Sequence, residues 1–200
     1  MEFLVFLGMG WDHIIDFSSY DHILFVFVLC ALFKLSEWKK ILTIVTAFTI
    51  GHSFTLALSA FNIIFIPVKL VEILIPATIV FTAITNILQK ERPGRIKTFD
   101  RRVMKNYFIA MSFGFVHGMG FASNFKFLMG DSVNIVKQLL AFNVGIELGQ
   151  IVIVLMILCI YFIINKYFNL IHREWNLFVS GAGFGVGGVL LITNILNYNS

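Results

Sequence analysis

Charge is scarce in this sequence. Lysine, arginine, aspartate and glutamate make up 13% of the 200 residues, whereas they account for about a quarter of a typical soluble domain. Proline occurs only 3 times, so few of the apolar stretches are interrupted. The 2 cysteines, Cys30 and Cys159, both lie in apolar stretches, where we expect packed side chains and no disulfide. This composition excludes an ordinary soluble protein, and we expect a single domain over residues 1–200.

Long apolar stretches dominate what remains, since 58% of the residues are hydrophobic. About 20 consecutive apolar residues cross a hydrocarbon core of roughly 30 Å as a helix. We therefore predict an all-α, polytopic membrane helix bundle of about six transmembrane helices. Residues 1–20, which contain two glycines and several ionisable residues, are expected to form an interfacial or re-entrant segment. The expected helices cover residues 19–35, 41–60, 69–89, 105–125, 135–164 and 175–196.

The basic residues predict the orientation of this bundle. The loops after the first, third and fifth expected helices hold 12 of the 15 lysines and arginines, and loop 90–104, with Pro93 and Gly94, is the most basic. Because basic loops stay in the cytoplasm, we expect both termini outside, in a multi-pass protein of the bacterial inner membrane. The positive net charge thus comes from loop residues that set the orientation in the membrane, and we expect no nucleic-acid partner. The expected partners are the lipid bilayer and a metal ion, and the sequence is compatible with a homo-oligomer.

A few ionisable side chains fall inside the expected helices, where each costs at least about 2.5–3.5 kcal/mol on insertion scales. Counting about 1.5 Å per helical residue places His22, His52 and His117 roughly 10–12 Å below the outer surface, and Glu147 roughly 18 Å below it. Four groups from four helices therefore converge on one layer. The full set of such residues is Asp21, His22, His52, Glu72, His117 and Glu147.

Each of these residues also has a simpler interpretation. A lone membrane histidine commonly serves packing or a helix–helix hydrogen bond. Asp21 is placed to cap a helix, and Glu72 to interact with a helix dipole. The presence of four of the five histidines (13, 22, 52 and 117) on the outer side nevertheless favours a shared site. Asn143 and Gln150 lie on the same helical face as Glu147, where they could orient ligands.

Imidazoles together with a carboxylate suit borderline divalent ions such as zinc, nickel, cobalt or copper. Calcium and magnesium prefer shells made of oxygen alone. Two glycine patterns predict close helix packing: Gly114 and Gly118 beside His117, and a second set in the last expected helix. That second set is Gly181, Gly185 and Gly188.

Four segments resemble the HupE/UreJ family in order and spacing. They are 20–25 (YDHILF), 46–57 (TAFTIGHSFTLA), 113–122 (FGFVHGMGFA) and 142–150 (FNVGIELGQ). The resemblance implies a secondary permease for nickel or cobalt, with signature polar positions at His22, His52, His117, Asn143 and Glu147 and with Asp21 beside them. His13 is a secondary candidate, because the family's corresponding histidine lies closer to its Asp-His pair than His13 does to His22.

The leading hypothesis is a permease for nickel, cobalt or zinc, and therefore not an enzyme. The cation would pass an acidic mouth made of Glu2, Asp12, Asp16 and Asp21 before it reaches the histidines. One alternative is an intramembrane zinc-dependent hydrolase, in which three histidines and an acidic residue activate water. The other is a metal-sensing or structural membrane subunit.

Overall fold

The computed structural model describes residues 2–16, 20–64, 66–89, 101–129 and 134–198, and the side chains of residues 101–102, 123–124 and 126–129 are not described. All of the secondary structure in these residues is helical. The all-α prediction is confirmed there. Most of the expected basic loop, residues 90–100, lies outside the described residues. The helices are α1 (Glu2–Ile15), α2 (Tyr20–Ala31), α3 (Trp38–Ala60), α4 (Val68–Leu88), α5 (Arg101–Met129), α6 (Ile135–Phe168) and α7 (His172–Tyr198), with a short 3₁₀ turn, η2 (Leu35–Glu37).

The six membrane crossings expected from the sequence are confirmed only in part. Within the described residues, four helices are long and apolar enough to cross a bilayer, namely α3 with η2, α4, α6 and α7. A fifth crossing is obtained if α1 and α2, which meet at 67°, form one bent span. The 12 residues of α2 are too short on their own for a core of about 30 Å. The 29-residue α5 has the length, but its middle carries glycines and His117.

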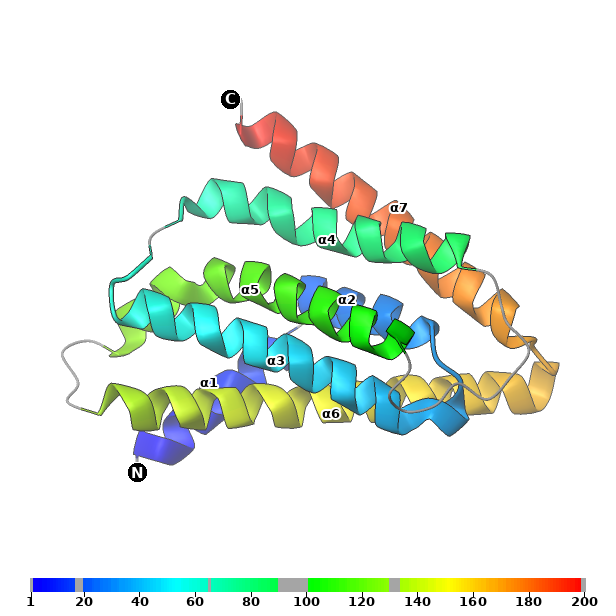
Figure 1. Ribbon diagram of the computed structural model, residues 1–200, viewed down its shortest axis with the longest axis horizontal. Coiled ribbons are helices and arrows are strands. Elements are labelled where there is room, and N and C mark those ends of the chain that lie inside the picture. Colours follow the sequence, from blue (N-terminus) through cyan, green and yellow to red (C-terminus); the bar gives the residue numbers. More distant parts are fainter. Residues whose placement is uncertain (1, 17–19, 65, 90–100, 130–133, 199–200) are drawn as a thin grey trace.

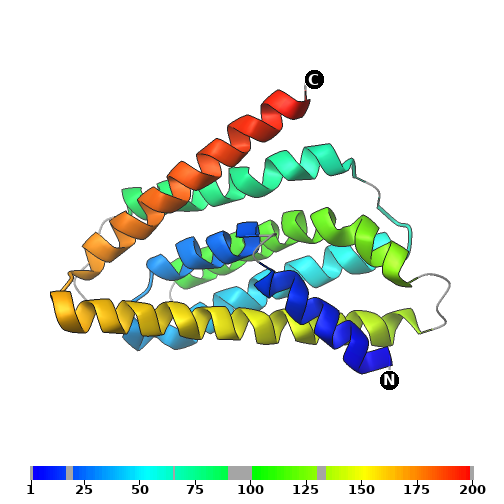
Figure 2. The ribbon, with the colours of Figure 1, turned by 180° about the vertical axis from the view of Figure 1, so that it is seen from behind.

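The helices lie roughly along one long axis (Figure 1). Helices α4 and α7 pack together on one side and α6 lies on the other, with α2, α3 and α5 between them. From behind, α1 crosses α6 obliquely (Figure 2). Both described ends of the chain lie toward the same end of the bundle, and the chain links α2 to α3 and α6 to α7 at the other end. The basic residues Lys34, Lys39, Lys40, Lys166 and Arg173 lie in or next to these two links, in the pattern on which the orientation prediction is based.

Glycines bring the helices that form the site into backbone contact. A Cβ atom at Gly114 of α5 would overlap the Phe48 carbonyl of α3, and one at Gly118 would lie 2.5 Å from the His52 carbonyl oxygen. The predicted close approach beside His117 is therefore confirmed, and the partner helix is α3. In the same way, Gly10 of α1 and Gly145 of α6 lie against each other's helix backbone, which fixes the crossing of α1 over α6.

The glycines of the last helix do not pack as expected. Gly181, Gly185 and Gly188 have open space where a Cβ would stand, so the predicted packing through them is wrong. Gly183 and Gly187 are instead the buried glycines of α7, against Val28 of α2 and against α4, respectively. The sequence has small residues in both registers, and the packing of α7 on α2 and α4 selects the register that contains Gly183 and Gly187.

A proline inside α4 creates a link between α4 and α7. Pro76 has no N–H, so it leaves the carbonyl of Glu72, four residues earlier, without its helical donor. The Asn194 side chain of α7 donates to that carbonyl at 2.6 Å. This bond joins α4 to α7 near the end of the bundle where both termini lie.

At the opposite end, buried polar side chains of α4 and α7 are bonded to backbone. Asn86 donates from Nδ2 to the Val28 carbonyl of α2 (2.8 Å), and Asn176 donates to the Asn86 carbonyl (3.2 Å). Ser180 donates to the Asn176 side chain at 2.9 Å. The Arg173 guanidinium donates to three carbonyl oxygens at the end of α4, including that of Ile87 at 2.6 Å. These bonds fasten α2, α4 and α7 to one another.

Candidate metal site

Three histidines from three helices meet near the middle of the bundle. Ring nitrogens of His13 (α1), His22 (α2) and His52 (α3) all lie within 4.8 Å of one another. The ring centroids are 4.7 Å apart for His13 and His22, 5.7 Å for His13 and His52, and 6.1 Å for His22 and His52. His13, ranked as a secondary candidate from its sequence spacing, is thus brought into the cluster. We call these three residues the histidine cluster.

Several nitrogens of the histidine cluster are buried without a hydrogen bond. Among the described residues, no partner is found for Nε2 of His13, Nε2 of His22 or either ring nitrogen of His52. A buried polar atom left unpaired costs about 1–3 kcal/mol, and nearly all such atoms in folded proteins have a partner. His52 is fully buried. Together, these nitrogens have the position and chemistry of ligands for a cation.

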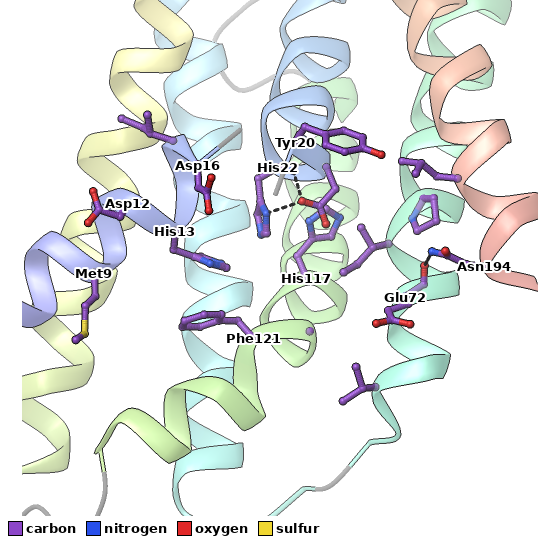
Figure 3. A pocket seen from close by; sticks show the side chains of 17 residues that line it. Met9, Asp12, His13, Asp16, Tyr20, His22, Glu72, His117, Phe121 and Asn194 are labelled. Atoms are coloured by element: carbon purple, nitrogen blue, oxygen red, sulfur yellow. Dashed lines mark hydrogen bonds and ion pairs between the residues drawn. The ribbon is translucent and has the colours of Figure 1, made fainter. Parts of the chain in front are cut away.

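Asp21 holds His22 in the orientation that a ligand needs. Its Oδ1 atom accepts the backbone N–H of His22 at 2.9 Å and lies 3.0 Å from Nδ1 of the imidazole (Figure 3). A carboxylate on Nδ1 favours the tautomer in which that nitrogen carries the proton, so the lone pair of Nε2 is free for a metal. Carboxylate–histidine pairs of this kind are common beside protein metal sites.

His117 of α5 lies beside the histidine cluster. Its ring centroid is 5.2 Å from that of His22, its side chain is fully buried, and Nδ1 has no partner among the described residues. Its other nitrogen, Nε2, lies 3.1 Å from the hydroxyl of Thr78 on α4. Sequence reasoning missed Thr78, because a threonine in an apolar helix is a common helix-bonding residue and gives no distinctive signal.

A large cavity leads to these histidines. It has a volume of about 1000 Å³, and His13, His22 and His117 line it (Figure 3), whereas His52 is not among its lining residues. Because Val68 and Glu72 at the start of α4 and Asn194 near the end of α7 also line it, the cavity lies in the half of the bundle that holds both termini.

The cavity wall is acidic. Four carboxylates line it, and three of them belong to the acidic mouth expected from the sequence, whereas Glu2 is not in the lining. The fourth comes from α4. The four are Asp12, Asp16, Asp21 and Glu72.

Glu147 is not a member of the histidine cluster. Glu147 on α6 accepts a hydrogen bond at 2.6 Å from Thr46, which precedes His52 by six residues on α3. Among the described residues, the cluster whose ligand atoms meet within 4.8 Å is made of His13, His22 and His52 and does not include Glu147. Residue counting along the sequence placed Glu147 some 6 Å deeper than the histidines. This difference in depth alone does not show whether Glu147 and the histidines belong to one site or to two.

Fold and site together define a multi-pass helical membrane protein with a buried histidine cluster that opens to an acidic cavity. The HupE/UreJ protein family model matches residues 1–195, essentially the whole chain, and the chain belongs to the HupE/UreJ family. A comparison with curated proteins and one with solved structures each give no match.

Proposed function

We propose that this protein is a secondary permease for a divalent transition metal, with nickel as its first candidate cargo and cobalt or zinc as the others. The HupE/UreJ family is a transporter-type family associated with nickel and cobalt, so the hydrolase alternative is not favoured. The observation that carries the proposal is the set of unpaired, buried imidazole nitrogens contributed by three helices.

The order of the groups supports a path for the cation. The four carboxylates of the cavity attract and concentrate cations at its mouth. The imidazoles of the histidine cluster then replace part of the water around the ion, with His117 placed beside them. Nitrogen ligands favour nickel, cobalt and zinc over magnesium and calcium, which are far more abundant in cells and prefer oxygen ligands.

The orientation of the path follows from the predicted topology. With the basic links in the cytoplasm, the cavity lies in the outward half of the bundle, and the cation enters from the outside. Movement inward then requires the ion to leave the imidazoles on the side of His52, which is the member of the cluster that does not line the cavity.

The direct test is nickel uptake into proteoliposomes, together with calorimetric nickel titration of the purified protein. We expect His22→Ala and His52→Ala to lower nickel affinity by at least about 100-fold and to abolish uptake, because each removes a ligand. His172→Ala is the matched control, since His172 lies at the opposite end of the bundle, near the Leu32 carbonyl (3.3 Å). Nickel affinity that is unchanged in His22→Ala and His52→Ala would show that the cluster is not the binding site.

A further inference from the structure

A second group of polar side chains, which range from the exposed Thr46 to the fully buried Gln150, lies where α3 and α6 meet. Glu147 accepts from Thr46 through Oε1, and Gln150 accepts from Thr49 through its side-chain oxygen, both at 2.6 Å. Asn143, Glu147 and Gln150 are spaced i, i+4 and i+7 along α6, so they form one stripe on one face of that helix. Two threonines of α3 thus hold two members of this stripe.

Each member of the stripe keeps an unpaired atom. Within the described part of the chain, Oδ1 of Asn143, Oε2 of Glu147 and Nε2 of Gln150 are buried and have no hydrogen-bond partner. Gln150 is fully buried. Pairing one polar group to a threonine while leaving its other half unpaired is costly in an apolar bundle, and a bound ligand removes that cost.

The amide of Gln150 is able to present an oxygen in place of its nitrogen. The two ends of a glutamine amide are interchangeable in shape. If the amide turns over, Nε2 donates to the Thr49 hydroxyl, which keeps the Val45 carbonyl, 3.3 Å away, as its own acceptor. Oε1 then stands at the unpaired position. The stripe can therefore offer oxygens from Asn143, Glu147 and Gln150.

The threonine-bonded part of this stripe lies on the side of His52 away from the cavity, whereas Asn143 lies one turn nearer the start of α6 and the cavity end of the bundle. Thr49 and Thr46 precede His52 by three and six residues on α3, which corresponds to about 4.5 and 9 Å along the helix. The displacement is toward the start of α3, away from the end of the bundle where the cavity lies. None of the α3 or α6 residues named here lines that cavity. His52 is the member of the histidine cluster that shares a helix with Thr46 and Thr49, and neither of its ring nitrogens has a partner among the described residues.

We propose that Asn143, Glu147 and Gln150 form a second, oxygen-lined cation site, which receives the divalent ion after it leaves the histidine cluster. The inference rests on the proposed function and deepens it by dividing the path into two sites. Carboxylate, amide and water oxygens bind nickel or cobalt more weakly than imidazoles do, so the ion passes from a selective site to a weaker one. A weaker inner site favours release, because conduction requires that the last site be easy to leave.

Manganese(II) is the probe that separates the two sites, since it prefers oxygen ligands and is detected directly by its paramagnetic resonance. Purified full-length protein is titrated with Mn²⁺ and, separately, with Ni²⁺. We expect Glu147→Gln to weaken Mn²⁺ binding by at least about tenfold while nickel affinity stays within about threefold of wild type. His52→Ala should do the reverse. Glu147→Gln should also lower nickel uptake into proteoliposomes while the histidine cluster still binds nickel.

A matched pair of threonine variants keeps the second site testable if Glu147→Gln fails to fold. Thr46→Val removes the donor to Glu147, whereas Thr43→Val changes an exposed residue one turn earlier on α3, whose hydroxyl bonds only to the Lys39 carbonyl among the described residues. We expect Thr46→Val to weaken Mn²⁺ binding several-fold and Thr43→Val to leave it unchanged.

Two results would overturn the second site. One is wild-type protein that binds no Mn²⁺, or binds it equally well after Glu147→Gln. The other is nickel affinity that falls as far in Glu147→Gln as in His52→Ala, which would make Glu147 part of a single site. Nickel binding that survives His52→Ala contradicts the proposed function instead, and the Mn²⁺ result still decides whether the oxygen-lined site exists.

Discussion

Two regions of the bundle contain buried polar side chains, and they treat these side chains in opposite ways. At the end opposite the termini, the buried Asn86 and Asn176 are bonded to carbonyls of neighbouring helices, as is the half-buried Arg173. In the half that holds the cavity, buried nitrogens of His22 and His52 have no partner among the described residues. Similar burial thus accompanies complete pairing in one region and missing partners in the other.

The difference indicates what each region is for. A polar group that is paired inside an apolar bundle specifies which helices meet and in which register. A polar group that is left unpaired lowers stability, and natural proteins keep such groups where binding requires them. This difference supports a structural role for the polar cluster of α2, α4 and α7, and it supports the proposed binding roles of the histidine cluster and of the stripe on α6.

Among the variants that test this comparison, we expect the largest effect, a loss of nickel affinity, at Asp21. Asp21→Asn keeps the size of the side chain but weakens its hold on the His22 imidazole, so nickel affinity should fall by about 10–100-fold, as is usual for residues that orient metal ligands. Calorimetric titration measures the change. Asp12→Asn is the control, because Asp12 also lines the cavity. A similar loss in both variants would mean that Asp21 acts only through its charge.

A smaller effect, on stability alone, is expected at Asn86. Asn86→Ala leaves the buried Val28 carbonyl without its donor, which should lower the free energy of unfolding by about 1–2 kcal/mol and leave nickel affinity unchanged. Unfolding in mixed detergent measures the first quantity. Thr85→Ala is the control, since the Thr85 hydroxyl bonds within its own helix, to the Thr82 carbonyl. A loss of nickel affinity in Asn86→Ala would break the division between the two regions.

The smallest effect should have the opposite sign. His52→Leu replaces unpaired imidazole nitrogens with an apolar side chain, so the metal-free protein should become more stable, by about 1 kcal/mol. Thermal unfolding without metal measures the shift. His172→Leu is the contrasting variant and should destabilise, because the His172 ring contacts the Leu32 carbonyl and the Tyr161 hydroxyl. Destabilisation by both variants would indicate that His52 also serves the fold.

Much of the helical layout could be predicted from the sequence, because apolar length is a local property. The expected helix 41–60 is found as Trp38–Ala60, and the expected helix 135–164 as Ile135–Phe168. The convergence of His22, His52 and His117 was also predictable, since depth in a bilayer follows from counting residues. That His13 joins them depends on α1 crossing α6 at Gly10 and Gly145, which is a tertiary contact.

The rest could not be predicted, because residue counting gives depth but not direction around a helix. Glu147 has the depth of a neighbouring ligand, yet its carboxylate bonds Thr46 on the far side of His52 from the cavity. Gly181 and Gly183 both belong to small-residue patterns on α7, yet only Gly183 of the two is packed. The residue Thr78 beside His117 is visible only once α4 and α5 are placed together.

The central claim is that the histidine cluster binds the cargo through imidazole nitrogens. X-ray absorption spectroscopy of the nickel-loaded protein tests it most directly, because imidazole rings give a characteristic outer-shell scattering. The account predicts that this scattering is present in the wild type and reduced in His13→Ala, and that His172→Ala leaves it unchanged. A shell made of oxygen alone, or imidazole scattering that persists undiminished in His13→Ala, would contradict it.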